Sequence, residues 1–307
     1  MDLFNSQPIQ LITKFITKGH ERSVKAKKNI ISSLLIKGAG IAISFVTLPI
    51  TLNYVDSATY GVWLTMSSIV GWFVFFDVGL THGLRNRFAE AKARGDDNLA
   101  RAYVSTTYFI LGIIFSGVWL IFLITNNFLD WSKILNVSAN MRSDVTTLAI
   151  IVFTYFCISF VFRIITTILL ADQYPAKSSL IDLMGQALAL IIILVLVRTT
   201  EGSLIKLGLA LCVSPLIVII GANFIFFNGR YKKYRPSFAT VKLSHTKNLF
   251  SLGVKFFIIQ LAAIIQYQTA NIIIARSFGT ADVTAYNVVY KYFGIPFMIF
   301  NIFLVPF

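Results

Sequence analysis

The sequence predicts an all-α, polytopic membrane protein: a helical bundle with a six-helix N-terminal lobe and the beginning of a second, repeated lobe. Hydrophobic residues make up 56% of the 307 residues and charged residues only 13%, whereas about a quarter of a soluble domain is charged. The apolar residues form runs of about 20, the length that a helix needs to cross the hydrocarbon core of a bilayer. Basic residues stand in short islands between these runs, which is typical of loops on the cytoplasmic side of a membrane.

We count seven apolar runs of this length and the beginning of an eighth. Within lipid a single continuous segment satisfies its backbone hydrogen bonds only as a helix. We therefore expect membrane spans at 31–54, 60–80, 102–125, 145–170, 180–197, 204–227 and 249–275, with the eighth beginning near Ala285.

These runs divide the chain into four expected regions. A basic cytoplasmic tail covers 1–30, the six-helix lobe covers 31–227, a basic loop covers 228–248, and the first two helices of an incomplete second lobe cover 249–307. The tail lacks the compact apolar segment and the cleavage site of a signal peptide. Its isoleucines at 9, 12 and 16 are compatible with a helix on the membrane surface or with a tail of no fixed structure.

The positions of the basic residues predict the orientation of the protein. Lysine and arginine are frequent in the tail, in the island from Arg85 to Arg101 and in the loop 228–248. The alternate loops carry few, among them Lys133, Arg142 and Arg276. Since basic loops stay in the cytoplasm, we expect a multi-pass membrane protein with its N-terminus in the cytoplasm.

Two short motifs occur twice in the same order. KNIIS at 28–32 and KNLFS at 247–251 are 219 residues apart, and DSATYGVW at 56–63 and DVTAYNVV at 282–289 are 226 apart. Both copies would begin on the cytoplasmic side, so the lobes would be related by an axis along the membrane normal. With the second offset, Phe307 corresponds to Thr81, and we expect the chain to be cut short within the second lobe.

Ionisable side chains within membrane spans are costly and usually face the interior of a bundle or a cavity. Lys37 shares a helical stripe with Ser44 and Thr51, and Arg163 shares one with Ser159 and Thr167. We therefore expect Lys37, Arg163 and Lys255 to face the interior of the bundle, and we treat Asp77, Asp182 and Lys291 as candidate coupling or gating residues.

Simpler interpretations of these charges stay open. Lys37 and Lys255 could bend back to the lipid headgroups, and Asp182 could favour the N-terminus of its helix. Asp77 is equally compatible with a structural ion pair.

The stretch YGVW…DVGLTHGLRNRFAEAKARGD from Tyr60 to Asp96, followed by LARAYVSTTYF, resembles the bacterial polysaccharide-export flippases of the O-antigen type. That family shares a superfamily with multidrug exporters of the MATE type. The resemblance implies a protein of the bacterial cytoplasmic membrane with two six-helix bundles around a cavity that opens alternately to each side. It further implies that this cavity is cationic, and Lys37, Arg163 and Lys255 are the positions here that would line it. It also implies an isoprenoid-diphosphate-linked oligosaccharide as the substrate, used in lipopolysaccharide biosynthesis with other polysaccharide assembly proteins as possible partners.

Two other functions are compatible with parts of the sequence. A cation-coupled multidrug exporter of the same superfamily would favour acidic residues in its cavity, whereas Lys and Arg outnumber Asp within the spans here. A membrane enzyme would need clustered polar groups in an outer loop, and the longest such loop, 126–144, has no such pattern.

No cofactor is expected from the sequence. Its histidines match no metal-binding motif, Cys157 and Cys212 lie in apolar runs, and the basic islands do not indicate a nucleic-acid partner. A coupling ion, H⁺ or Na⁺, is left open.

Overall fold

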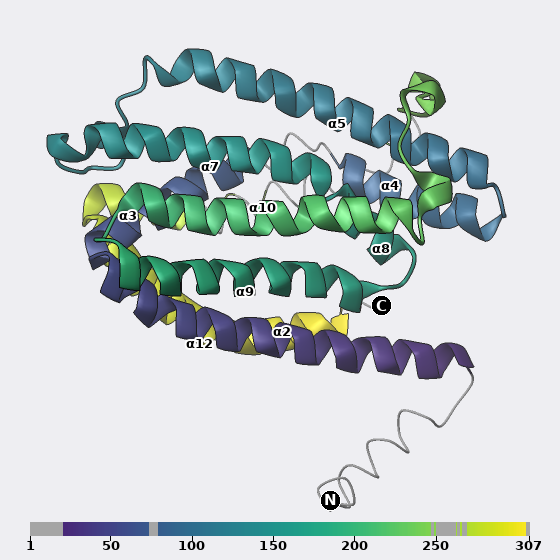
Figure 1. The fold of residues 1–307 in the computed structure, drawn as a ribbon, viewed down its shortest axis with the longest axis horizontal. Coiled ribbons are helices and arrows are strands. Elements are labelled where there is room, and N and C mark those ends of the chain that lie inside the picture. The colour runs from purple at the N-terminus through teal and green to yellow at the C-terminus, as the bar shows by residue number, and fades with distance from the viewer. Residues whose placement is uncertain are drawn as a thin grey trace, which may run out of the picture.

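The structure is a computed structural model that describes residues 21–73, 79–246, 249, 262, 265 and 269–304. The described residues form helices joined by short connections and contain no β-strand. Long helices lie roughly along the long axis of the molecule, with α5 at one edge and α2 near the other (Figure 1). The prediction of an all-α bundle is confirmed.

The bounds of the α-helices account for most of the predicted spans. Five segments in the described part of the chain, which include all or part of α2, α5, α7–α8, α9 and α10, are long and apolar enough to cross a membrane. The helices are α2 (Glu21–Tyr54), α3 (Ser57–Gly71), α4 (Leu80–Ala93), α5 (Asp97–Asn126), α6 (Trp131–Ile134), α7 (Arg142–Phe162), α8 (Ile164–Ala171), α9 (Pro175–Thr199), α10 (Leu204–Asn228) and α12 (Thr280–Leu304).

Local capping explains where several helices begin. The carboxylate of Asp56 accepts a hydrogen bond from the backbone N–H of Thr59 at 2.7 Å, and that of Asp96 accepts one from Leu99 at 2.9 Å. The hydroxyl of Ser203 does the same for α10, and Pro175 occupies the first turn of α9. These residue types are favoured at helix starts because they satisfy or dispense with unpaired N–H groups.

The prediction that the basic island from Arg85 to Arg101 is a loop is wrong. Most of it is the amphipathic helix α4, and only the turn 94–96 separates α4 from α5. Leu80, Leu84 and Phe88 recur at helical spacing and are fully buried, which is how a charged segment becomes an amphipathic helix. Gly79, at φ +77°, precedes α4 in a left-handed conformation that glycine adopts without strain.

Several other boundaries differ from the predictions, among them the end of the second span: α3 ends at Gly71, and Leu80, the last residue of that predicted span, begins α4. α2 begins ten residues before the predicted span, within the region expected to be a tail. The fourth span is interrupted at Arg163, which separates α7 from α8. α12 begins at Thr280, ahead of the predicted start near Ala285. Most of the predicted seventh span, 249–275, lies outside the described residues.

The largest buried cluster joins α3, α4, α5, α7, α8 and α10 through apolar and aromatic side chains. The rings of Phe122 on α5 and Phe153 on α7 stack with centroids 3.8 Å apart, and those of Phe115 and Phe160 stack at 4.3 Å. Aromatic pairs of this kind add to the burial of their area. This cluster therefore lies away from α2 and α12, whereas a second, smaller buried cluster joins α2, α3, α9 and α10.

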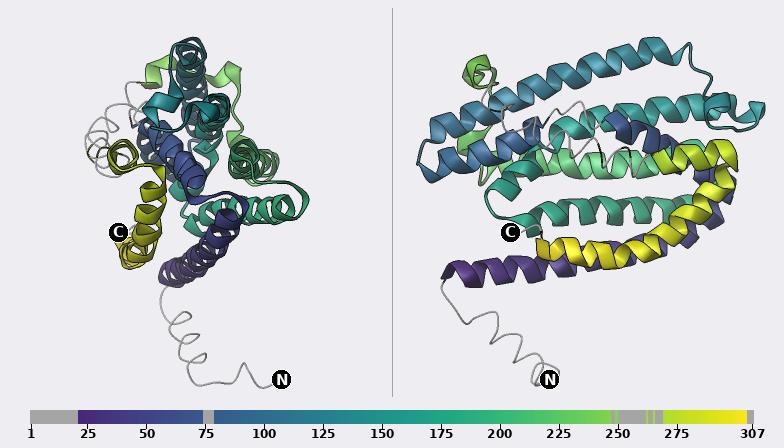
Figure 2. Two further views of the ribbon diagram at one scale, coloured as in Figure 1. Left: turned by 90° about the vertical axis from the view of Figure 1, so that its left-hand side faces the viewer. Right: turned by 180° about the vertical axis from the view of Figure 1, so that it is seen from behind.

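Helices α3 and α12, which begin at the two copies of the repeated motif, pack against each other. Gly61 lies so close to α12 that a Cβ atom there would be 1.7 Å from the carbonyl oxygen of Thr280. Nearby, the hydroxyl of Thr284 donates to the carbonyl of Ser57 at 2.7 Å, and Asn271 donates to the hydroxyl of Ser68 at 2.6 Å. From this contact α12 extends alongside α2 (Figure 2).

Candidate functional site

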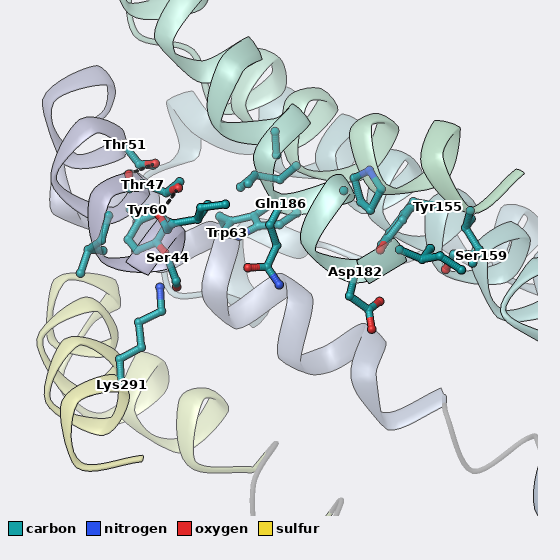
Figure 3. Close-up of a pocket in the computed structure, with 18 of the residues that line it drawn as sticks. Ser44, Thr47, Thr51, Tyr60, Trp63, Tyr155, Ser159, Asp182, Gln186 and Lys291 are labelled. Atoms are coloured by element: carbon teal, nitrogen blue, oxygen red, sulfur yellow. Dashed lines mark hydrogen bonds between the residues drawn. The ribbon is translucent and has the colours of Figure 1, made fainter. Parts of the chain in front are cut away.

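A cavity of about 550 Å³ lies where α2, α3, α7, α9, α10 and α12 converge. Hydroxyl groups of Ser44, Thr47 and Thr51 line it from α2, and the rings of Tyr60 and Trp63 from α3 (Figure 3). A second cavity of about 430 Å³ lies between α2, α9 and α12. Both cavities are lined by Ser44, Asp182, Gln186 and Lys291, so they adjoin.

The polar wall of the larger cavity follows from helix periodicity. Tyr155, Ser159 and Arg163 are four residues apart along α7, which places them on one face of the helix. On α9, Asp182 and Gln186 have the same spacing and also line the cavity. Of the two predicted stripes, Ser44, Thr51, Ser159 and Arg163 line the larger cavity and Lys37 lines the smaller one, whereas Thr167 lines neither.

Arg163 and Asp182 form an ion pair across this wall. The guanidinium Nη2 lies 2.6 Å from the carboxylate Oδ1, and the two side chains are 47% and 43% exposed. Both groups thus remain open to the cavity while they contact each other. A pair this exposed contributes at most about 1 kcal/mol where water reaches it, so it can be opened by a competing ligand.

The structure also places two lysines at the cavities. Lys37 lines the smaller one, and Lys291 reaches from α12 toward Ser44 and lines both (Figure 3). Neither forms an ion pair with a described residue. Four predicted site residues, Lys37, Arg163, Asp182 and Lys291, are thus brought together, whereas Lys255 and Asp77 lie outside the described residues.

Several residues that line the cavities were not among the site residues predicted from the sequence. Gln186 contributes an amide to both cavities, and Tyr60, Trp63 and Tyr155 contribute aromatic rings. The spacing of Gln186 four residues after Asp182 was a signal that could have found it. Three cations, one carboxylate, an amide, hydroxyls and rings can together hold an anionic group with a polar ligand attached.

A separate polar cluster surrounds Asp172, which follows α8. Its carboxylate pairs with Lys92 of α4, lies 3.5 Å from Nε of Arg230, and accepts a hydrogen bond from the hydroxyl of Tyr231 at 3.0 Å. Burial, together with the negative charge of Asp172, raises the pKa of Tyr231. The cluster joins α4, the turn after α8 and the segment after α10, and we assign it a structural role.

A second contact ties the segment after α10 to the start of α5. The hydroxyl of Tyr234 donates to Asp97 at 2.6 Å, and Lys233 lies 3.0 Å from the same carboxylate. Burial and the hydrogen bond to Asp97 raise the pKa of Tyr234 to about 12, so its phenol keeps its proton at neutral pH.

Among the described residues no cluster of three or more His, Cys, Asp or Glu side chains could hold a metal ion.

Comparison with known proteins identifies a family and two relatives with related sequences. The family model described as "Polysaccharide biosynthesis protein" matches residues 26–306. A Salmonella typhi protein named as an O-antigen transporter is 24% identical over 276 residues, which cover 88% of this chain and 60% of the relative. A protein of Salmonella typhimurium with the same name is 23% identical over 283 residues, with the same coverage. The chain therefore spans about 60% of the length of these curated relatives.

A solved structure shares the fold. It is described as the inward-facing conformation of a multidrug resistance MATE family transporter of the MOP superfamily, and it superposes with a TM-score of 0.67. The two sequences are 12% identical, and the match covers 85% of this chain and 60% of the other. At this identity the match establishes a MATE-like arrangement of helices and nothing about the ligand.

Proposed function

The chain belongs to the polysaccharide biosynthesis protein family, and on that premise we propose that the full-length protein is a flippase for an isoprenoid-diphosphate-linked oligosaccharide. It would move this substrate across the bacterial cytoplasmic membrane for surface polysaccharide of the O-antigen type, by alternating access of its cavity. In this proposal the N-terminus of α2 lies in the cytoplasm. The names of the relatives as transporters favour transport over catalysis.

The observation that carries the proposal is the gathering of Arg163, Lys37 and Lys291 at two adjoining cavities that Asp182 also lines. A diphosphate that leaves water without compensation is strongly disfavoured in a low-dielectric space. Fixed cations offset that cost, and the fork of an arginine can bind two phosphate oxygens at once. The cationic excess favours an anionic ligand over the cationic drugs of the alternative exporter.

Within this proposal the cavity residues have separate roles. Arg163 holds the diphosphate, and Lys37 of α2 and Lys291 of α12 add positive charge at the smaller cavity. Asp182 is the resting counter-ion of Arg163, and its displacement by substrate would link binding to a change in the cavity. The hydroxyls, Gln186 and the rings contact the sugars.

The test is export by the full-length protein in a strain that lacks its own O-antigen flippase. We expect Arg163→Ala to abolish surface polysaccharide, Arg163→Lys to weaken it, and Lys37→Ala and Lys255→Ala each to impair it. Arg94→Ala is the control, because Arg94 is 70% exposed and pairs only with Glu90 among the described acids. Normal export by all three alanine variants at normal abundance would refute the cationic cavity.

A further inference from the structure

The break between α7 and α8 leaves one backbone carbonyl without its helical partner. In a continuous α-helix the N–H of Thr166 would donate to the carbonyl of Phe162, four residues earlier. Instead it donates to the carbonyl of Arg163 at 2.9 Å, and the hydroxyl of Thr166 donates to the same oxygen at 2.7 Å. The carbonyl of Phe162, which belongs to the peptide that enters Arg163, therefore needs another donor.

Asn223 of α10 supplies that donor. Its Nδ2 donates to the carbonyl of Phe162 at 2.8 Å and to the carbonyl of Ile219, in its own helix, at 2.7 Å. The Oδ1 of the same amide accepts a hydrogen bond from the hydroxyl of Tyr108 on α5 at 2.6 Å. Asn223 is only 7% exposed, so both hydrogens and the oxygen of the amide are used inside the bundle.

The three contacts also determine which way the amide faces. With nitrogen and oxygen exchanged, Oδ1 would face two carbonyl oxygens and Nδ2 would face a phenol that then had to accept. Tyr108 thus orients Asn223, and Asn223 anchors the peptide between Phe162 and Arg163. Irregular backbone within a membrane is tolerated where neighbouring side chains satisfy it in this way.

We propose that Asn223, oriented by Tyr108, is a positioning residue for Arg163: it holds the peptide before Arg163 in place and thereby sets where the guanidinium stands in the cavity. Arg163 is the last residue of the α7 stripe through Tyr155 and Ser159, at the point where the helical ladder ends. Without the anchor, this end of α7 can fray and the guanidinium loses its fixed place opposite Asp182. The inference rests on the proposed function, because it assumes that Arg163 binds the anionic group.

The experiment measures binding of farnesyl diphosphate, used as a probe, to the purified full-length protein. We expect Asn223→Ala to weaken binding about tenfold and Tyr108→Phe about threefold. Thr154→Val is the matched control. It removes another hydrogen bond between two helices, from Trp119 of α5 to Thr154 of α7 at 3.0 Å, without touching the Phe162–Arg163 peptide. We expect it to leave binding within twofold.

A double-mutant cycle separates positioning from general damage to the fold. Arg163→Lys keeps the charge and leaves measurable binding. On that background Asn223→Ala and Tyr108→Phe should cost little more, because the geometry that they support is already gone. Equal losses on both backgrounds, or normal probe binding by Asn223→Ala, would overturn the proposal.

Three further outcomes have separate meanings. If Asn223→Ala does not fold, Tyr108→Phe takes its place, since it keeps the ring and removes only the hydroxyl. Normal probe binding by Tyr108→Phe, or an equal loss of binding with Arg163 and with Lys at position 163, would then overturn the proposal. If Arg163→Lys and Arg163→Ala both bind the probe as tightly as the unchanged protein, the proposed anion site itself has failed. If they bind weakly while the Asn223 and Tyr108 variants bind normally, only the positioning role is wrong.

Discussion

At the scale of single residues, the contact between Arg163 and Asp182 is the most informative one. The two groups are 2.6 Å apart and both remain open to the cavity. An anionic ligand for Arg163 would therefore have to compete with a carboxylate that is already present. Removal of the Asp182 carboxylate should therefore strengthen binding of an anionic ligand, whereas removal of a cation should weaken it.

We expect Asp182→Asn to tighten binding of farnesyl diphosphate by the full-length protein roughly three- to tenfold, which corresponds to about 0.6 to 1.4 kcal/mol. The substitution removes a nearby negative charge and a competitor for the guanidinium. Export should nevertheless fall if the release of Asp182 is part of the transport cycle. Equilibrium binding and export, measured on the same variant, check both statements.

The control for this variant is Asp144→Asn, which removes an exposed carboxylate in the first turn of α7, far along the helix from Arg163. Asp144→Asn should change neither the binding of farnesyl diphosphate nor export. Weaker binding by Asp182→Asn would show that the carboxylate helps to build the site and does not compete for it.

At the scale of helices, the contact between α3 and α12 depends on the absence of a side chain at residue 61. We expect Gly61→Ala to push the two helices apart, because its Cβ would lie 1.7 Å from the carbonyl oxygen of Thr280. Overpacking of this kind typically costs about 1 to 3 kcal/mol. Gly112→Ala on α5 is the matched control, since no atom lies within 4 Å of its Cβ position.

The approach of α3 to α12 and to the helical segment just before α12 can be followed by oxidative crosslinking of Ser68→Cys, on α3, with Asn271→Cys, in that segment, since the two side chains touch at 2.6 Å. Gly61→Ala should lower the crosslinking yield, and Gly112→Ala should leave it unchanged. An undiminished yield with Gly61→Ala would mean that the close approach is not needed to hold this end of the bundle together.

At the scale of the whole molecule, polar contacts join α3, at one end of the bundle, to α12 and to the segment before it, which carries Asn271. Asn287 extends the contact through a hydrogen bond to Asn271 at 2.7 Å. If access alternates, this end must open once in each cycle. We expect the Ser68→Cys/Asn271→Cys crosslink to stop export by the full-length protein, and a reductant to restore it. Undiminished export by the crosslinked protein would place the gate elsewhere.

The orientation of the bundle yields a further expectation. Ala93, at the end of α4, and Ser138, before α7, are both exposed and lie in connections on opposite sides of the predicted membrane. In intact cells a membrane-impermeant thiol reagent should label Ser138→Cys and not Ala93→Cys, because basic loops stay in the cytoplasm. The two native cysteines are buried and should add little background. The reverse pattern of labelling would invert the assignment.

The sequence by itself determined the class of the fold and the approximate positions of its long helices, and it singled out Arg163, which lines the larger cavity. Apolar runs and their periodicity are local properties, and a bilayer leaves such runs one main conformation. The spacing of four residues along α7 and α9 likewise predicts which side chains share a face.

Only the tertiary structure decided which faces meet. The pairing of Arg163 with Asp182, the position of Lys291 opposite Ser44, and the role of Asn223 each join residues from different helices. The helix α4 was missed because its charges masked a buried face that packs against α5 and α8. Such contacts depend on how separate helices approach one another, and no local pattern in a single sequence carries that information.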